Sequence, residues 1–159
     1  MRPPRQQTIR VTANEEKARP ESHVSWRVAV SRLWGHRRGG PVVLRAYFDE
    51  RCIAAVRASE WAHSPQKQEL GQLERLLDDE LDLRTARDVR RSIACAVFDA
   101  RLASGKLTIP KEIVWLLAQD NPARDLTVIN VGLYLEVWPT LVWQQRMRAH
   151  AREVKSTQT

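Results

Sequence analysis

The sequence predicts an α+β, β-rich fold in which two similar β-rich parts flank a pair of helices. Three observations predict it. Short alternating apolar segments separated by turn residues occur in both halves of the chain, a charged segment with helical periodicity lies between them, and the two β-rich parts resemble each other. A chain of 159 residues, 43% hydrophobic and 28% charged, is long enough for one globular domain and too short for two of typical size.

The first β-rich part follows a short N-terminal arm. Residues 1–8 carry two prolines and two arginines without a hydrophobic period, so we expect a flexible basic arm. Residues 8–12 alternate like a short strand, and a charged loop is expected at 14–22. Residues 42–44 and 52–56 are predicted to form a β-hairpin.

Two helices are expected between the β-rich parts. Ser64-Pro65 is a helix-start signal, because Ser caps free N–H groups and Pro is tolerated in the first turn. The first helix should run to about residue 81, with one narrow apolar stripe made of Leu70, Leu73, Leu77 and Leu81. A capping box at residues 85–88 should start a second amphipathic segment, which continues through Val89, Ile93 and Val97.

The second β-rich part has the clearer pattern. Residues 97–102 and 106–109 predict a hairpin around Ser104-Gly105, because Gly can take the positive φ that a tight turn needs. A second hairpin is expected from 126–131 to 133–138.

Helices and tryptophans complete this part. Pro110 opens a short helix between the two hairpins, and Thr140 is expected to cap a last helix. Three of the six tryptophans lie on apolar faces, so we expect them in the core or in a subunit interface: Trp115, Trp138 and Trp143.

The two β-rich parts superimpose loosely, which favours an internal duplication. Residues 41–46 fall on 126–131, and residues 53–56 fall on 135–138. In each part a tryptophan follows five residues after the last matched strand residue. The alternative is that any two hairpins followed by helices look alike.

Charge is the first indication of function. Twenty-six basic and nineteen acidic residues give a net charge of +7, which favours a polyanionic partner. Residues 58–82 carry a net charge of −5 and residues 83–106 a net charge of +4, so acidic and basic blocks alternate. Most basic residues are arginines, which suit bidentate contacts to phosphate and guanine, although a GC-rich coding sequence produces the same bias.

The composition argues against secretion, a membrane span and catalysis. Cys52 and Cys95 are too few for a disulfide scaffold, so free buried thiols and a cytoplasmic location are expected. No apolar run is long enough for a membrane span. The four histidines are scattered, and phosphate-loop and nucleophile-elbow motifs are missing. We therefore expect no enzyme, no metal, no cofactor and no small-molecule ligand.

Several stretches of the second part resemble a known family. Residues 105–113 (GKLTIPKEI), 126–132 (LTVINVG) and 134–138 (YLEVW), with Trp143, are similar to the C-terminal repeat of MraZ proteins. The resemblance covers residues 91–150. It implies two AbrB-like swapped-hairpin repeats, of the type shared with the SpoVT regulators, forming one pseudo-dimeric barrel-like body with linker helices.

The resemblance divides the chain into five segments. Residues 1–8 are the basic arm and residues 9–63 a divergent first AbrB-like repeat. Residues 64–95 are the linker helices and residues 96–150 the second AbrB-like repeat. Residues 151–159 are a polar tail.

The family contacts DNA through a loop motif, Asp-x-x-x-Arg, in each repeat. Residues 15–19 (EEKAR) are similar to it, with Glu15 as the supporting acid and Lys17 and Arg19 as the basic residues. A planar guanidinium can bind guanine N7 and O6 together, so Arg19 is expected to contact bases. The alternative for Lys17 and Arg19 is a solvated run of charge.

The second half carries the same motif in altered form. Leu102 replaces the acid and Lys106 replaces the arginine, with Gly105 before it as a motif-supporting residue. Lys106 and Arg101 are expected to contact phosphates, which adds affinity without sequence information.

The resemblance implies a sequence-specific DNA-binding transcriptional regulator. We expect a repressor that binds double-stranded DNA at tandem short repeats upstream of its own operon, as a ring-like homo-oligomer located in the cytoplasm at the nucleoid. The alternative is an antitoxin-like or adaptor protein that dimerises through the hairpin body and binds a protein partner. A third alternative is a structural oligomer without DNA binding.

Overall fold

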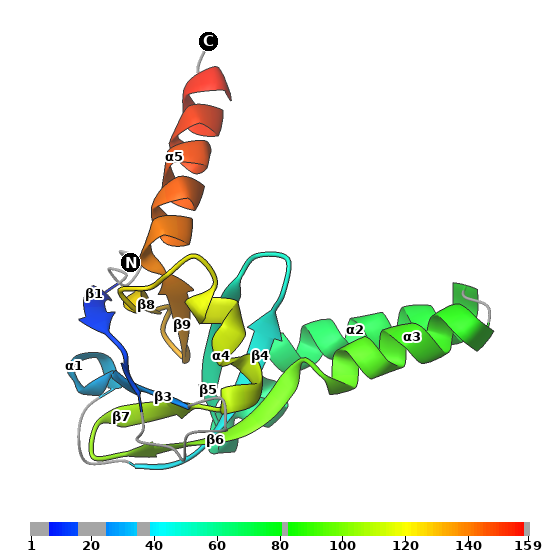
Figure 1. Cartoon of the computed structure of the whole chain (residues 1–159). Helices are drawn as coiled ribbons and strands as arrows, with labels where there is room; N and C mark the ends of the chain where they lie inside the picture. The colour runs from blue at the N-terminus through cyan, green and yellow to red at the C-terminus, as the bar shows by residue number, and fades with distance from the viewer. Residues whose placement is uncertain (1–6, 16–24, 35–38, 81–82, 158–159) are drawn as a thin grey trace.

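The computed structural model describes residues 7–15, 25–34, 39–80 and 83–157 (Figure 1). Within these residues, nine strands form one antiparallel sheet in the order β1-β8-β9-β5-β4-β6-β7-β3-β2. The strands are β1 (Gln7–Thr12), β2 (Asn14–Glu15), β3 (Trp26–Ala29), β4 (Gly40–Tyr47), β5 (Cys52–Arg57), β6 (Val97–Ala103), β7 (Lys106–Ile109), β8 (Asp125–Asn130) and β9 (Tyr134–Pro139). The helices are α1 (Ser31–Trp34), the 3-10 helix η1 (Ala58–His63), α2 (Pro65–Glu80), α3 (Leu83–Ala94), α4 (Lys111–Ala118) and α5 (Thr140–Thr157). The fold is α+β and strand-rich, as the sequence predicts.

The chain itself joins the two edges of this sheet. β1 and β2 stand at opposite ends of the strand order, yet only Ala13 separates them along the chain. Ala13 is buried, and its N–H donates to the carbonyl of Arg124 at 3.0 Å. Because the two edge strands continue into each other, the sheet curls into a nearly closed barrel with an apolar interior.

The strand pairings repeat with a pseudo-two-fold relation between the halves. β4 pairs with β5 as β8 pairs with β9, and β2 pairs with β3 as β6 pairs with β7. β1 pairs with β8 as β6 pairs with β4, so each half lends a strand to the other. The pairs β3–β7 and β5–β9 also cross between the halves. The repeated hairpins are therefore interleaved.

The predicted hairpins form, with small shifts at their ends. Residues 42–44 and 52–56 lie within β4 and β5, and the hairpins of the second half form as expected. β1 already begins at Gln7, so the arm predicted at 1–8 overlaps the strand by two residues, and its residues 1–6 lie outside the described part of the chain. Asn14-Glu15, expected in a loop, forms β2 because it pairs with β3.

The structure corrects part of the sequence alignment between the repeats. Leu44 pairs with Ala55 of β5. Val128 pairs with Val137 of β9, the residue that the alignment matches to Ala55. Leu44 therefore corresponds to Val128, whereas the sequence alignment places it on Ile129. Ile129 faces the outside of the barrel, and a shift of one residue exchanges the two faces of a strand.

One apolar cluster fills the barrel, with contributions from both halves. Alternate residues of the strands point inward, and α4 adds its apolar face. The largest fully buried members include Leu44, Ile53, Leu107, Ile109, Leu117, Leu126 and Leu135. Removal of this surface from water is the main favourable contribution to folding.

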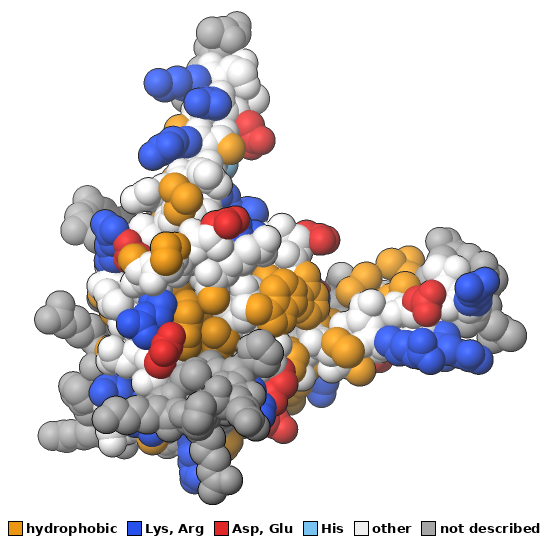
Figure 2. Space-filling model, viewed as in Figure 1, with side chains coloured by type: hydrophobic (Ala, Val, Ile, Leu, Met, Phe, Trp, Pro, Cys, Tyr) orange, Lys and Arg blue, Asp and Glu red, His pale blue; other side chains and the backbone are white. Residues whose placement is uncertain are grey.

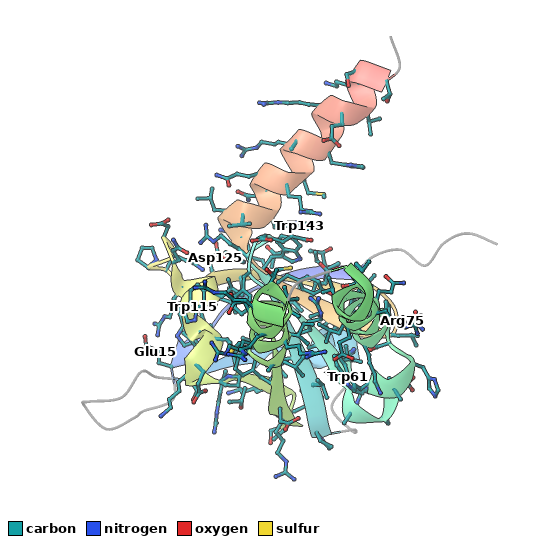
Figure 3. The ribbon with its side chains drawn as sticks, turned by 90° about the vertical axis from the view of Figure 1, so that its right-hand side faces the viewer. Glu15, Trp61, Arg75, Trp115, Asp125 and Trp143 are labelled. Atoms are coloured by element: carbon teal, nitrogen blue, oxygen red, sulfur yellow. The ribbon has the colours of Figure 1, made fainter. Side chains whose placement is uncertain are left out.

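A smaller cluster covers the outside of the sheet beneath α5. Its buried members are Cys52, Ile129 and Trp138, and Trp143 packs against them. Trp143 lies at the base of α5, where the helix meets the barrel (Figure 3). Trp138 is 2% exposed, and its Nε1 donates to Glu136 at 2.8 Å. The predicted interior placement is therefore confirmed for Trp138.

Trp115 is not part of the core, and one of the two thiols expected to be buried is exposed. Trp115 is 53% exposed and stacks on Phe48, with ring centroids 5.9 Å apart. Its neighbours on α4 at both sides are buried, so the 3.6-residue period turns Trp115 outward. Cys95 is exposed where the chain leaves α3, whereas Cys52 is buried and this burial raises the pKa of its thiol.

Two helical arms extend from the barrel (Figure 1). α2 and α3 form an antiparallel hairpin arm between the halves of the chain, and α5 forms the second arm. Ser64 caps α2 as predicted, because its Oγ accepts a hydrogen bond from the Lys67 N–H at 3.1 Å. Of the predicted leucine stripe, Leu70 is buried and Leu73 is 39% exposed. The other two side chains, Leu77 and Leu81, lie outside the described part.

Polar contacts anchor the base of the α2–α3 arm to β4. Arg45 is 8% exposed, and its guanidinium stacks over the Tyr47 ring at 4.1 Å. Arg45 also lies 3.8 Å from the carboxylate of Glu69 on α2, to which the Tyr47 hydroxyl donates at 3.0 Å. Burial raises the pKa of Tyr47, so this hydroxyl remains a donor at neutral pH. These contacts hold the first turns of α2 against β4.

The second helix of the arm starts earlier than predicted. α3 spans Leu83–Ala94, so the expected capping box at 85–88 lies inside the helix. Ala86, one of the four residues of that box, is buried, and α3 packs against α2. Val97, expected to continue the helix, is the first residue of β6.

Most of the residues expected to form a polar tail belong to the helix α5. It begins at Thr140 and continues through residues 151–157. The Thr140 hydroxyl donates to Asp125 at 3.1 Å and lies 3.1 Å from the Thr127 hydroxyl, so it ties the first turn of α5 to β8. No helix in the described ranges is long and apolar enough to cross a membrane.

Leu107→Ala should lower the free energy of unfolding by about 2–5 kcal/mol, because its side chain is fully buried where β7 crosses between the halves. Urea denaturation followed by circular dichroism measures the change. Leu133→Ala is the matched control: Leu133 is 64% exposed, so its loss should change the same quantity by less than about 0.5 kcal/mol. Equal effects of the two substitutions would contradict this placement of the core.

Candidate nucleic-acid interface

The pair β3–β7 crosses between the halves and presents one face to solvent. Arg27 and Lys106 are exposed on that face, between inward residues that are buried: Trp26, Val28, Leu107 and Ile109. Arg27 pairs with Asn14 of β2. Lys106 pairs in the same way with Ala103 of β6. Arg27 and Lys106 therefore occupy equivalent positions in the two halves.

Arg101 lies on the same outer surface. It is exposed on β6, two residues before Ala103, and Ala103 pairs with Lys106. Because alternate residues of a strand share a face, Arg101 and Lys106 point to the same side of the sheet. We call Arg27, Arg101 and Lys106 the basic strand face. Asp99, two residues before Arg101, is also exposed and bounds this face with a negative charge.

A tight turn places Lys106 at one end of the β3–β7 pair. Ser104 and Gly105 connect β6 to β7 with φ values of 53° and 73°. Two successive positive φ values are the geometry of a type I′ hairpin turn, and Gly105 adopts it without the steric cost of a Cβ. The hairpin predicted around these residues is confirmed.

The corresponding connection in the first half is longer. It comprises residues 16–25, ten residues where the second half uses two. Lys17 and Arg19 belong to this connection and lie outside the described residues. The sequence candidates for base contact are therefore located by their flanking strands alone.

The two connections enter the β3–β7 pair from opposite ends. The first leads into Trp26, which pairs with Ile109, and the second leads into Lys106, which pairs with Ala29. Trp26 and Ala29 are three positions apart along β3. At a rise of about 3.4 Å per residue, the two connections are roughly 10 Å apart along the strands.

Glu15, the supporting acid of the sequence motif, is bound to the other half. Its Oε1 lies 3.3 Å from Nη1 of Arg124, in the turn before β8. The carbonyl of Arg124 accepts the N–H of Ala13. Glu15 therefore fastens the β1–β2 crossing to the second half.

Arg10 is committed to a structural ion pair. Its Nε donates to both carboxylate oxygens of Asp125, at 2.8 and 2.9 Å, and its Nη2 adds a further contact. The hydrogen bonds from Arg10 lower the pKa of Asp125, and the carboxylate raises the pKa of Arg10. Asp125 also accepts the Thr140 hydroxyl, so β1, β8 and α5 meet at this carboxylate.

Arg27 is absent from the candidates selected by sequence. The signal that could have found it is the alternation in residues 26–29, where an arginine stands between two apolar residues. This segment is short, and only its pairing with β7 identifies its outer face.

Within the described residues, no group of three or more His, Cys, Asp and Glu side chains could hold a metal ion. The candidate site is an exposed basic surface on a strand-rich α+β barrel with two interleaved halves. Comparison of the sequence with protein-family models gave no match, and comparison with curated proteins gave no significant match.

Asp125→Asn should destabilise the protein at neutral pH and leave it nearly unchanged in acid. The folded-state pKa of Asp125 lies below its ordinary value of 3.8, so the ion pair contributes stability above that value and loses it as the pH falls through the folded pKa. Thermal unfolding of both proteins across this range measures the effect. The Tm difference should narrow below about pH 3.8. A pH-independent difference would contradict the assignment.

Proposed function

We propose that this chain is a sequence-specific DNA-binding transcriptional regulator of the MraZ type, and that it represses from tandem short repeats upstream of its own operon. The observation that carries the proposal is the basic strand face, where equivalent residues of the two halves, Arg27 and Lys106, lie between two connecting loops. Duplex DNA has a local two-fold relation between its strands, so a pseudo-two-fold basic surface suits it. The net charge of +7 agrees with a polyanionic partner.

The proposed division of labour follows from the lengths of the two connections. The short turn holds Lys106 close to the sheet, so Lys106 and Arg101 contact phosphates. The ten-residue connection carries Arg19, whose guanidinium binds guanine N7 and O6 in the major groove, with Lys17 on the adjacent backbone. A protein with this activity is located at the nucleoid.

Arg19→Ala should abolish the preference for the natural site. A bidentate arginine–guanine contact contributes about 1–3 kcal/mol of discrimination, so binding to a fluorescent fragment of the upstream region should fall to the level of scrambled DNA. Arg75→Ala, an exposed arginine of α2, is the control and should retain the preference. If the wild type itself fails to distinguish the two DNAs, the regulator function is wrong.

The proposal includes self-association through an exposed apolar surface. Phe48 and Trp115 are 38% and 53% exposed and stack on each other. A cavity of about 400 Å³ at the root of the α2–α3 arm continues from Phe48 to Leu73 and Ile93. In Figure 2, hydrophobic side chains gather at the centre of the body and along the root of this arm. An apolar surface of this kind is typical of a protein contact.

A second copy of the chain fits this surface. The arm formed by α5 exposes three apolar side chains: Leu141, Met147 and Val154. It also carries Arg146, Arg148 and Arg152, and its Arg146 already pairs with Glu50, a residue lining the cavity, at 3.5 Å. The exposed apolar side chains of α5 support binding of this helix from one copy to the apolar cavity of the next. Several copies on tandem sites would raise the effective concentration of weak individual contacts.

Trp115→Ala should reduce the molecular mass measured by sedimentation equilibrium, because it removes the largest exposed apolar side chain of this surface. Leu133→Ala, which removes an exposed leucine from the β8–β9 turn, should leave the mass unchanged. A wild type that sediments as a monomer at all concentrations would contradict self-association, and would favour an adaptor that uses the same surface for a different protein.

A further inference from the structure

The α3 helix of the arm carries a row of exposed arginines. Arg84, Arg87 and Arg91 recur at i, i+3 and i+7, which places them on one helix face, and all three are exposed. We call these three residues the arginine ridge. The fourth arginine of α3, Arg90, flanks it. Asp88 lies at the opposite border of the ridge.

The opposite face of α3 is apolar and packs on the arm and the body. Ala86 is buried, while Val89 and Ile93 are partly buried and line the cavity at the root of the arm. The arginine ridge therefore points away from the packed side, toward solvent. In Figure 2 a run of Lys and Arg side chains follows the lower edge of the arm, over α3.

Like charges lie beside one another within the ridge, and Asp88, four residues after Arg84 and three before Arg91, offsets part of their repulsion. Arg84 and Arg87 are an i,i+3 pair of like charges, and Arg87 and Arg91 an i,i+4 pair, and such pairs repel on a helix surface. A partner with regularly spaced negative charges removes the repulsion. Arginine favours phosphate as that partner, because its planar guanidinium forms two parallel hydrogen bonds to phosphate oxygens.

The ridge and the basic strand face belong to one basic segment of the chain, residues 83–106, which has a net charge of +4. α3 ends at Ala94 and β6 begins at Val97, and residues 92–100, which include the exposed Asp99, separate Arg91 from Arg101. In the view of Figure 1, α3 forms the lower edge of the arm, and β6 and β7 form the lower edge of the body.

We infer that the arginine ridge is a second DNA site, which binds the phosphate backbone of the duplex. The inference rests on the proposed function. The ridge extends about 10 Å along the helix at 1.5 Å per residue. It adds affinity that depends on salt and not on sequence, and it lengthens the protected stretch of DNA on the side of the arm.

The test compares two double variants of the full-length protein. R87Q/R91Q removes two charges from the ridge, and K67Q/R75Q removes two charges from exposed positions of α2 on the same arm (Arg75 is labelled in Figure 3). Both are titrated against the upstream fragment and a scrambled fragment over a range of salt concentrations. Circular dichroism and the Tm establish that both variants fold as the wild type does.

R87Q/R91Q should weaken binding to both fragments alike, by about fivefold or more at moderate salt. It should also reduce the slope of log K against log salt by about 2, because each lost phosphate contact reduces it by about 0.9. The ratio of the two affinities should stay at the wild-type value, since phosphate contacts carry no sequence information. K67Q/R75Q should change the slope by clearly less.

The outcomes separate this inference from the proposed function. If R87Q/R91Q keeps the wild-type slope while the wild type prefers its own fragment, the ridge is not a DNA site and the regulator function stands. If the wild type shows no preference but R87Q/R91Q still loses affinity and slope, the ridge stands and the sequence-specific function falls. If poly-glutamate binds the wild type more tightly than DNA at equal salt, and R87Q/R91Q loses that binding, the ridge serves an acidic protein and the inference is wrong.

Discussion

The pairing of strands from one half with strands from the other is the constraint on which the rest of the structure depends. β1 completes its hydrogen bonds on β8, β3 on β7, and β5 on β9. Neither half therefore contains a finished sheet, and the interior is filled by side chains from both. The outer surface of β3–β7, where Arg27 and Lys106 lie, exists only after the halves have combined. Folding and the assembly of the candidate site are the same event.

The two halves share their pairings and differ in what is attached to them. The first half connects β2 to β3 through ten residues, and the second connects β6 to β7 through two. α1 is four residues long where α4 has eight. The covering of the sheet also differs, because η1 and α2 follow β5, whereas α5 follows β9. The repeated frame thus carries one long connection and one short turn, which places Lys106 at the start of β7.

The basic residues divide into two groups by what they contact. Arg10, Arg124 and Arg146 form ion pairs with carboxylates that join separate elements, and these pairs hold the outside of the barrel together. The basic strand face and the arginine ridge are exposed. Net charge alone does not separate these groups. Their positions in the structure do, because the first group joins separate elements and the second lies on exposed faces of strands and of α3.

The sequence by itself determined those features of this protein that depend on signals within a few neighbouring residues. Ser64-Pro65 starts α2 and Ser104-Gly105 makes the turn, because capping and positive φ depend on local chemistry. The partner of Glu15 was decided by the tertiary structure, because Arg124 belongs to the other half of the chain.

The candidate site also depends partly on local sequence and partly on long-range pairing. Lys106 and Arg101 are recognisable in the sequence as basic residues beside a turn. Arg27 joins them only because β3 pairs with β7 across the two halves. Long-range pairing follows from which face of each strand is buried, and that is a property of the whole barrel rather than of any short segment.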